Sequence, residues 1–247
     1  MKEIPMLFKD SMVAAIMSGT KTETRRLVFN DDDYPDGDEY SKAEIVYNPE
    51  IADPKEDEIV PMTLKGACIQ FNDGEHIVKH NYGTEGDVIW VRESWRPFLK
   101  KAAEQPVSGA VYDMCIQFRD EAIVRVLAED GDWFMNKTNN GSKFRWQPNM
   151  FLYRRYARTF LKRTFTKVER LQDITEEGAI AEGICEFTKD ETVFKYGLEG
   201  WEWATMPYTA VGAYKMLWEL INGKGSWDLN PWVIVIGFEK IDNYGKK

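Results

Sequence analysis

Metal or redox chemistry in this 247-residue chain would depend on three cysteines and two histidines. Cys68, Cys115 and Cys185 are far apart and odd in number, and no Cys-x-x-Cys pair exists. This spacing indicates neither a disulfide framework nor a structural zinc site. His76 and His80 are four residues apart, which would suit a metal on a helix, but the segment between them has the composition of a strand. We therefore predict no metal site.

Positive charge gathers in one stretch, although the chain as a whole carries −9. Between Asp31 and Glu58 there are twelve acidic residues and two lysines, a local net of −10, so the rest of the chain is near +1. Seven residues of Phe151–Arg170 are positive: Arg154, Arg155, Arg158, Lys162, Arg163, Lys167 and Arg170. Because surface fields decay over about 10 Å in physiological salt, such a run can bind phosphates even on an acidic chain. We predict RNA contacts at Arg154, Arg155 and Arg158; the alternative is a solvated face beside the acidic stretch.

The nine tryptophans offer surfaces on which an unpaired base could stack. Trp90, Trp95 and Trp146 are the candidates for such stacking. Because most tryptophans in a domain of this size must be core residues, we assign Trp218 and Trp232 to the core. We assign Trp95 or Trp146 to a binding pocket.

Hydrophobic periodicity and turn residues predict the elements that must position these side chains. The segment Asp10–Ser18 has an apolar stripe and is followed by Gly19, which is typical of a short helix. Asp173–Glu176 has the spacing of a capping box and opens a helix that runs to Glu182 and is closed by Gly183. The other predicted elements are an extended segment at Thr20–Phe29 and strands at Asp87–Arg92, Val111–Phe118, Ala122–Ala128, Arg158–Leu171 and Trp232–Ile241. A helix is predicted at Val211–Ile221, with Tyr214, Leu217, Trp218 and Ile221 on one face.

Two insertions interrupt this series of elements. The acidic insertion covers about residues 30–61, and its charge, prolines and glycine predict a loop mostly outside the core. The second covers about residues 98–145. Scattered strands with few helices favour an α+β fold, a curved sheet or small barrel, in one domain over residues 1–247. The apolar run Trp232–Phe238 is too short to span a bilayer, so we expect a cytoplasmic protein that does not bind a membrane.

Four motifs, in this order, resemble an ASCH domain of the PUA-like group. They are Gly19–Arg26, similar to the family's G-x-K-T-x-T-x-R, then Gly86–Val91, Val168–Glu177 with the helix after it, and Trp232–Phe238. Trp90–Trp95 and Gly225–Trp232 are similar to segments of large ASCH proteins that are common in phages and prophages. The first motif alone is only moderately specific, so the resemblance depends on the order of all four. It covers most of the chain except the acidic insertion.

The resemblance implies a PUA-like pseudo-barrel of mixed strands with a few flanking helices and a cleft beside the first motif. Members of this group handle RNA or modified nucleobases. Some small bacterial members are amidohydrolases that deacetylate N4-acetylcytidine through a lysine, a threonine and a glutamate, which fall on Lys21, Thr24 and Glu182 of this chain. The resemblance therefore implies hydrolysis of an N4-acetylcytidine-like nucleoside without metal or cofactor. The chain differs from those enzymes by its two insertions and by the aromatic Trp90–Trp95 segment.

Amide hydrolysis by these residues needs a nucleophile, a base and an acid. Thr24 Oγ can attack the acetyl carbon, and Lys21 can act as base if burial and the nearby Arg25 and Arg26 lower its pKa. Glu182 can protonate the leaving nitrogen and later activate water, and Arg26 or a backbone N–H can stabilise the oxyanion. In a regular strand Lys21 and Thr24 would face opposite sides, so the arrangement requires a bulge or turn between them. The alternative is an ordinary ion pair between Lys21 and Glu182, with Thr24 as a strand residue.

We predict that substrate contacts come from polar and aromatic residues around the same cleft. They are Arg25, Arg26, Arg92, Glu93, Trp95 and Trp146. A catalytic cleft would take a modified nucleoside, whereas a non-catalytic reader would hold a modified base or single-stranded RNA. A third hypothesis is a phage-type interaction protein in which residues 31–58 mimic nucleic acid or bind a basic protein. Turnover needs Thr24, a reader needs aromatics and arginines around the base, and the third function would depend on residues 31–58.

Overall fold

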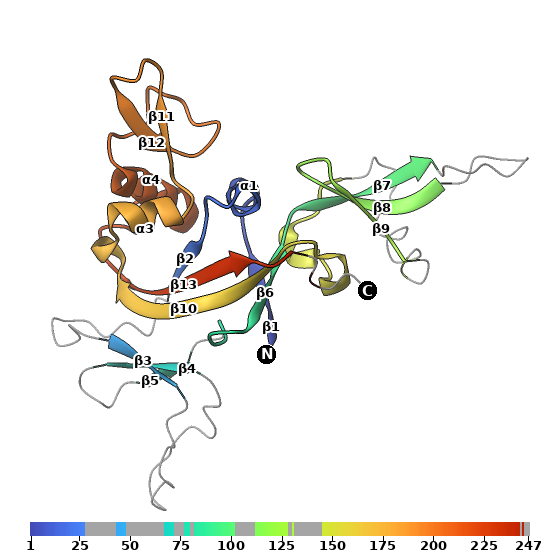
Figure 1. Cartoon of the computed structure of the whole chain (residues 1–247), viewed down its shortest axis with the longest axis horizontal. Coiled ribbons are helices and arrows are strands. Elements are labelled where there is room, and N and C mark those ends of the chain that lie inside the picture. The colour runs from blue at the N-terminus through green and yellow to red at the C-terminus, as the bar shows by residue number, and fades with distance from the viewer. Residues whose placement is uncertain are drawn as a thin grey trace, which may run out of the picture.

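The computed structural model describes residues 1–27, 43–47, 67–71, 77–79, 82–101, 112–127, 130, 145–242 and 244. In this part of the chain, strands are more numerous than helices, and they form one five-stranded sheet and several smaller sheets (Figure 1). This arrangement confirms the prediction of a mixed α+β fold. No helix within these ranges is both long enough and apolar enough to cross a membrane.

The large sheet has the strand order β1–β6–β10–β13–β2. Its strands are β1 (Glu3–Leu7), β6 (Val88–Arg92), β10 (Phe160–Arg170), β13 (Trp232–Lys240) and β2 (Glu23–Leu27). β1 and β6 are parallel and the other neighbours are antiparallel, so the sheet is mixed. β10 and β13 are long, curved strands that lie side by side (Figure 1). All residues of β13 from Trp232 to Phe238 are buried, which confirms the predicted buried final strand.

This sheet is open among the described strands, because β1 and β2 are its edges and do not pair with each other. A closed barrel, as the family resemblance would imply, is therefore not present there. Helix α1 (Asp10–Ser18) connects the two edge strands and has the predicted bounds. Arg26 Nη2 donates a hydrogen bond to Leu7 O at 2.7 Å, so one side chain bridges the ends of β2 and β1.

Helices α3 (Glu176–Ala181) and α4 (Ala210–Asn222) lie together beside the sheet, with the hairpin β11 (Cys185–Thr188) and β12 (Phe194–Gly197) beyond them (Figure 1). α4 confirms the predicted helix at 211–221. The N-cap of α3 differs from the prediction. Thr175 accepts a hydrogen bond from Gly178 N–H at 3.1 Å, whereas Leu171–Asp173 forms a 3₁₀ turn instead of the first helical residues. The hydroxyl of Thr175 satisfies an amide that the helix leaves unpaired, so the helix starts at Glu176.

The main core lies between the large sheet and the helices. It contains apolar side chains from α1, from α4 and from β13, among them Ile16, Leu217 and Ile234, each at most 1% exposed. Trp218 and Trp232 are each 4% exposed, as their assignment to the core predicts.

Both insertions contain strands. β3 (Ala43–Tyr47), β4 (Ala67–Phe71) and β5 (Ile77–Lys79) form a three-stranded sheet, so the expectation of a loop throughout residues 30–61 is wrong at 43–47. The apolar pair Ile45 and Val46 favours a strand there despite the surrounding charge. β5 confirms the strand predicted between His76 and His80, which themselves lie outside the described residues.

The second insertion begins within β7 (Trp95–Lys101), which pairs with β8 (Tyr112–Phe118) and β9 (Ile123–Arg125). β8 and β9 confirm the two strand-like pieces predicted in this part of the sequence. This small sheet lies near the opposite end of β10 and β13 from β11 and β12 (Figure 1).

Candidate functional site

The chain after α1 turns Lys21 toward the end of α3. Lys21 forms an isolated antiparallel bridge with Glu182, the residue that follows α3. Its own N–H donates to Ala15 O at 3.0 Å, which ties the turn to α1. The regular strand begins only at Glu23, so Lys21 lies outside it. The alternation of a strand therefore does not force Lys21 and Thr24 onto opposite faces.

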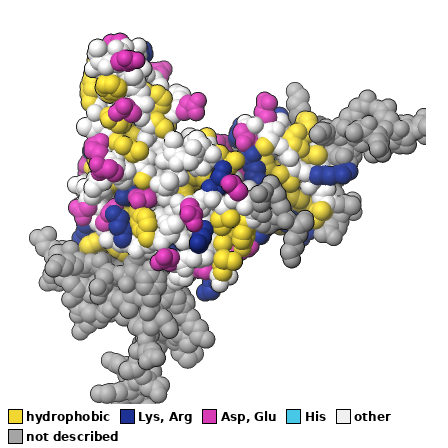
Figure 2. All heavy atoms as spheres, in the orientation of Figure 1, with side chains coloured by type: hydrophobic (Ala, Val, Ile, Leu, Met, Phe, Trp, Pro, Cys, Tyr) yellow, Lys and Arg dark blue, Asp and Glu magenta, His cyan; other side chains and the backbone are white. Residues whose placement is uncertain are grey.

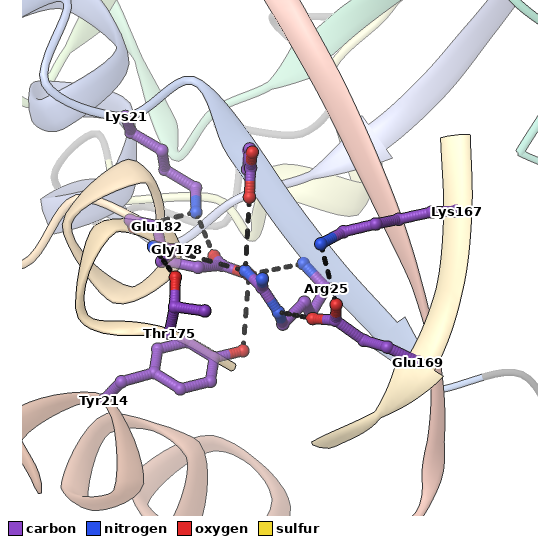
Figure 3. A network of polar contacts seen from close by, with 9 residues as sticks. Lys21, Arg25, Lys167, Glu169, Thr175, Gly178, Glu182 and Tyr214 are labelled. Atoms are coloured by element: carbon purple, nitrogen blue, oxygen red, sulfur yellow. Dashed lines mark hydrogen bonds and ion pairs between the residues drawn. The ribbon is translucent and has the colours of Figure 1, made fainter. Parts of the chain in front are cut away.

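The carboxylate of Glu182 is the centre of a buried polar network (Figure 3). Lys21 Nζ donates to Glu182 O at 2.8 Å and forms an ion pair with the carboxylate. The same carboxylate accepts hydrogen bonds from the main-chain N–H of Arg25 and, at 3.3 Å, from the Tyr214 hydroxyl. Arg25 Nη1 lies 3.5 Å away. Three residues, Lys21, Arg25 and Tyr214, thus fix the position of one carboxylate.

The guanidinium of Arg25 belongs to the framework of this network. Its Nε donates to Glu169 Oε1 at 2.8 Å, and Lys167 Nζ lies 2.8 Å from the other oxygen of Glu169 (Figure 3). The side chain of Arg25 is only 1% exposed. Arg25 holds Glu182 in place, and because it also lines the cavity beside this network, its contact with a substrate stays a prediction.

Burial changes the acidity of two groups in the network. The pKa of Lys21 is lowered from its ordinary 10.5, because desolvation of the ammonium outweighs the attraction of Glu182. The pKa of Tyr214 is raised well above 10.0 by burial and then by the Glu182 carboxylate. Tyr214 therefore keeps its proton and serves as a donor, while Lys21 is the group whose proton is easier to remove.

A cavity of about 230 Å³ adjoins the network, bordered by residues of the edge strands β1 and β2 and by α4. Thr24, Arg26 and Glu182 contribute polar groups to its wall, and Tyr214 and Trp218 line it from α4. Most of the remaining wall is apolar. A few polar groups in a mostly apolar concave wall are typical of a small-molecule site.

Of the three residues implied by the family resemblance, Thr24 and Glu182 line this cavity and Lys21 does not. Thr24 is 3% exposed, lines the cavity and makes no side-chain hydrogen bond within the described residues. Lys21 Nζ has no hydrogen bond to Thr24 and does not line the cavity, so its link to the cavity runs through Glu182. The structure thus places Thr24 and Glu182 at one cavity and Lys21 directly behind it.

Of the two arginines predicted beside them, Arg26 has the more open position. It lines the cavity, holds Leu7 O with Nη2 and lies with its guanidinium carbon 5.2 Å from the centre of the Phe8 ring. Its Nε has no acceptor in the described part of the chain. Arg26 is therefore held less tightly than Arg25, which is paired with Glu169 and Glu182.

The other predicted substrate contacts lie away from this cavity. Arg92 donates to Met150 O at 3.1 Å and covers the Trp90 ring. Trp95 is 1% exposed and packs in a separate apolar cluster with Ile116 and Phe118, so the prediction that it lines a pocket is wrong.

Glu93 lines a different cavity, and Trp146 contacts Arg119, which also lines that cavity. Glu93 accepts hydrogen bonds from Arg158 and Thr159 and helps to line a second cavity of about 360 Å³ on the other side of α1. The Trp146 ring is close to two guanidinium groups, those of Arg96 and Arg119, at 5.1 and 3.8 Å. Neither residue lines the cavity that holds Thr24.

The three arginines predicted to bind RNA are all paired with carboxylates. Arg154 binds Glu3, Arg155 binds Asp130, and Arg158 binds Glu93 and Asp120. On the face shown in Figure 2, basic side chains lie among acidic ones. This pairing lowers the positive charge that the run can offer to phosphates, and RNA contact through these residues stays a prediction.

The sequence analysis placed two residues of the site, Tyr214 and Trp218, in the interior but did not assign them to a site. Tyr214 and Trp218 follow the apolar periodicity of α4, which correctly places them inside. Periodicity does not reveal that the Tyr214 hydroxyl meets Glu182 or that Trp218 lines a cavity, because both depend on contacts between distant segments.

Comparison of the chain with protein-family models, curated proteins and solved structures found no match. The structure itself defines a mixed α+β domain with a small cavity at the unpaired seam of its main sheet. Beside that cavity, a buried Lys–Glu ion pair and a threonine hydroxyl provide groups that could carry out acyl chemistry.

Proposed function

We propose that the chain binds a cytidine-type base carrying an acyl group on its exocyclic nitrogen and hydrolyses that amide. The observation that carries the proposal is the position of Thr24, a cavity-lining hydroxyl without a partner in the described residues, beside the Glu182 carboxylate bound to Lys21. The resemblance to ASCH amidohydrolases supports the same three residues. The proposal includes the assignment of the open five-stranded sheet to the PUA-like group of folds.

The size of the cavity favours a base over a larger ligand. Its volume of about 230 Å³ is below the roughly 300–1,000 Å³ typical of sites that enclose drug-sized molecules. A single base with a short acyl group fits such a space, while the attached ribose would remain toward solvent. The apolar wall also suits the faces of a flat ring.

In the proposed reaction the Thr24 hydroxyl attacks the acyl carbon. A bond forms between Thr24 Oγ and that carbon, the C–N bond breaks, and the base leaves with a proton on its exocyclic nitrogen. Neutral Lys21 accepts the hydroxyl proton by way of Glu182 and then returns that proton through the Glu182 carboxyl group to the leaving nitrogen. The guanidinium of Arg26 stabilises the oxyanion. Water then hydrolyses the ester on Thr24 and releases acetate, which restores the hydroxyl.

A second candidate function is a reader that holds the modified base without turnover. The observation in its favour is that Lys21 Nζ is enclosed and already bound by two oxygens of Glu182. Lys21 also does not line the cavity, so its amine has no direct contact with a bound substrate. The two functions share the cavity and differ in whether product is released.

Release of acetate from N4-acetylcytidine distinguishes the two functions. Purified protein should release acetate, and Thr24→Ala should abolish release while binding of the nucleoside is nearly kept. Lys21→Arg should be nearly as damaging, because a guanidinium keeps its proton. Glu182→Gln should slow the reaction by roughly 10²–10⁴-fold, the usual effect of losing a general acid or base.

Thr166→Ala is a matched control, since Thr166 is also a β-strand threonine but does not line the cavity. Binding without acetate release in the wild type would exclude hydrolysis and favour the reader. Release that survives Thr24→Ala would show that water, and not Thr24, is the nucleophile.

A further inference from the structure

Tyr214 is a buried, titratable residue at the cavity to which the proposed reaction gives no role. It lines the cavity from α4 and is 3% exposed. Its hydroxyl donates a hydrogen bond to Glu182 Oε1 at 3.3 Å. Burial raises the pKa of this hydroxyl well above 10.0, so it keeps its proton. Tyr214 is therefore a neutral donor held directly against the carboxyl group that the reaction needs.

The two oxygens of that carboxyl group have different partners. Glu182 Oε2 is paired with Lys21, which does not line the cavity. Oε1 accepts hydrogen bonds from the main-chain N–H of Arg25 and from the Tyr214 hydroxyl. In the proposed reaction a proton passes between Lys21 and the leaving nitrogen through this carboxyl group. The orientation of the carboxyl group therefore decides whether the proton can reach both, because proton transfer requires hydrogen-bond geometry.

Tyr214 holds the carboxyl group from an element that supplies none of its other hydrogen bonds. Lys21 and Arg25 belong to one short segment, the turn after α1 and the start of β2. Tyr214 belongs to α4 and is 32 residues from Glu182. Lys21 and Tyr214 approach the carboxyl group from different directions (Figure 3). Contacts from two elements restrict the rotation of a side chain that contacts from one segment would leave more freedom.

On the basis of the proposed function, we propose that Tyr214 is a positioning residue of the reaction, whose hydroxyl orients Glu182 so that the proton is delivered to the leaving nitrogen. Tyr214 takes up no proton, and no bond to it forms or breaks. It acts through Glu182, so loss of its hydroxyl slows the chemical step and leaves binding of the substrate nearly unchanged. The effect can be large, because small displacements of a reacting group reduce rates strongly.

The Tyr214→Phe variant tests this role, since it removes the hydroxyl and keeps the ring. With N4-acetylcytidine as substrate, kcat for acetate release should fall about tenfold, the effect of one hydrogen bond. KM and the Kd of the nucleoside should change less than about twofold.

Tyr196→Phe is the matched control. The Tyr196 hydroxyl also donates to a glutamate, Glu186, at 2.6 Å, and neither residue lines the cavity. Its loss should change kcat less than about twofold, as expected for a site without shared partners. Thermal unfolding of both variants verifies that they are folded.

A double-mutant cycle shows whether Tyr214 acts through Glu182. In the Glu182→Gln background no carboxyl group is left to orient, so Tyr214→Phe should slow the reaction by less than about twofold there. A general disturbance of the cavity by Tyr214→Phe would instead lower kcat by the same factor in both backgrounds.

The outcomes separate this role from the proposed function. If the wild type releases acetate and Tyr214→Phe has the same kcat, or the two substitutions act additively, the role of Tyr214 is overturned while the proposed function stands. A raised KM with unchanged kcat would also overturn it, because Tyr214 would then bind the substrate directly. If the wild type releases no acetate, the proposed function fails and the positioning role fails with it.

Discussion

At the scale of single residues, the buried pair of Lys21 and Glu182 dominates the site. Burying an ammonium and a carboxylate costs desolvation energy, which their attraction offsets only when both are well hydrogen-bonded. Glu182 meets this condition through Arg25 and Tyr214, whereas Lys21 has only the two oxygens of Glu182. Lys21 is consequently the member of the pair whose charge the fold disfavours, as the direction of its pKa shift shows.

The Lys21→Met variant tests this description without any assumption about activity. It leaves the Glu182 carboxylate with fewer partners, so it should lower the free energy of unfolding by about 3 kcal/mol, the lower end for a broken buried pair. Lys162→Met is the control, because the Lys162 side chain is 55% exposed and should cost no more than about 0.5 kcal/mol.

The difference in stability between the wild type and Lys21→Met should depend on pH, and the pKa shift of Lys21 gives the direction. Because the folded-state pKa of Lys21 is below 10.5, the unfolded chain binds more protons there between the two pKa values. The stability of the wild type relative to Lys21→Met should therefore rise with pH through that window and level off above about 10.5. Urea unfolding of both proteins at several pH values measures this difference in stability. A difference that falls as the pH increases would contradict the lowered pKa of Lys21.

At the scale of elements, the site depends on how closely the end of α3 approaches the turn after α1. Gly183 ends α3 with a φ of +99°, a conformation that glycine adopts without strain. A Cβ at this position would lie 3.1 Å from Ala15 Cβ and 3.3 Å from Lys21 Cβ. A side chain here would therefore push Lys21 and Glu182 apart.

Gly183→Ala should be more harmful than an alanine at another glycine with positive φ. Backbone strain costs about 1–2 kcal/mol, and crowding should add about 1–3 kcal/mol. Gly200→Ala provides the control, since Gly200 has a φ of +84° and an added Cβ would meet no atom within 4 Å. Thermal unfolding gives the stabilities, and nucleoside binding should also weaken only in Gly183→Ala. Equal effects of the two variants would mean that the close approach does not matter.

At the scale of the whole molecule, charge is divided very unevenly along the chain. Residues 31–58 carry a net of −10, and the remainder is near neutral. Within the acidic stretch, β3 pairs with β4 and lies close to β10, so these five residues are part of the folded structure. The hypothesis that the stretch binds a basic protein stays a prediction, since most of it lies outside the described residues.

Deletions on either side of β3 test how much of the acidic stretch folding needs. Removing residues 31–41, or residues 49–58, should change stability by less than about 1 kcal/mol, because closure entropy varies only logarithmically with loop length. Removing residues 43–47 should cost more, because it deletes β3 and its hydrogen bonds to β4. Loss of cooperative thermal unfolding in either flanking deletion would show that the acidic stretch is integral to the fold.

Local signals in the sequence were sufficient to predict several of the elements. The apolar stripe and the glycine that follows it predicted α1 with its observed bounds, and the β-branched runs predicted β6, β8 and β13. The sequence also placed Tyr214 and Trp218 on the inner face of α4. These features follow from side-chain period and turn chemistry within about ten residues.

The positions of those residues relative to one another depend on contacts between distant segments of the chain. The contact between Lys21 and Glu182 joins residues 161 positions apart, and sequence spacing cannot reveal whether such residues meet. The same limitation explains Trp95 and Trp218: both are buried aromatic residues, but one packs in a core cluster and the other faces a cavity. Because the cavity lies where β1 and β2 fail to pair, it exists only once the sheet has formed with an open seam.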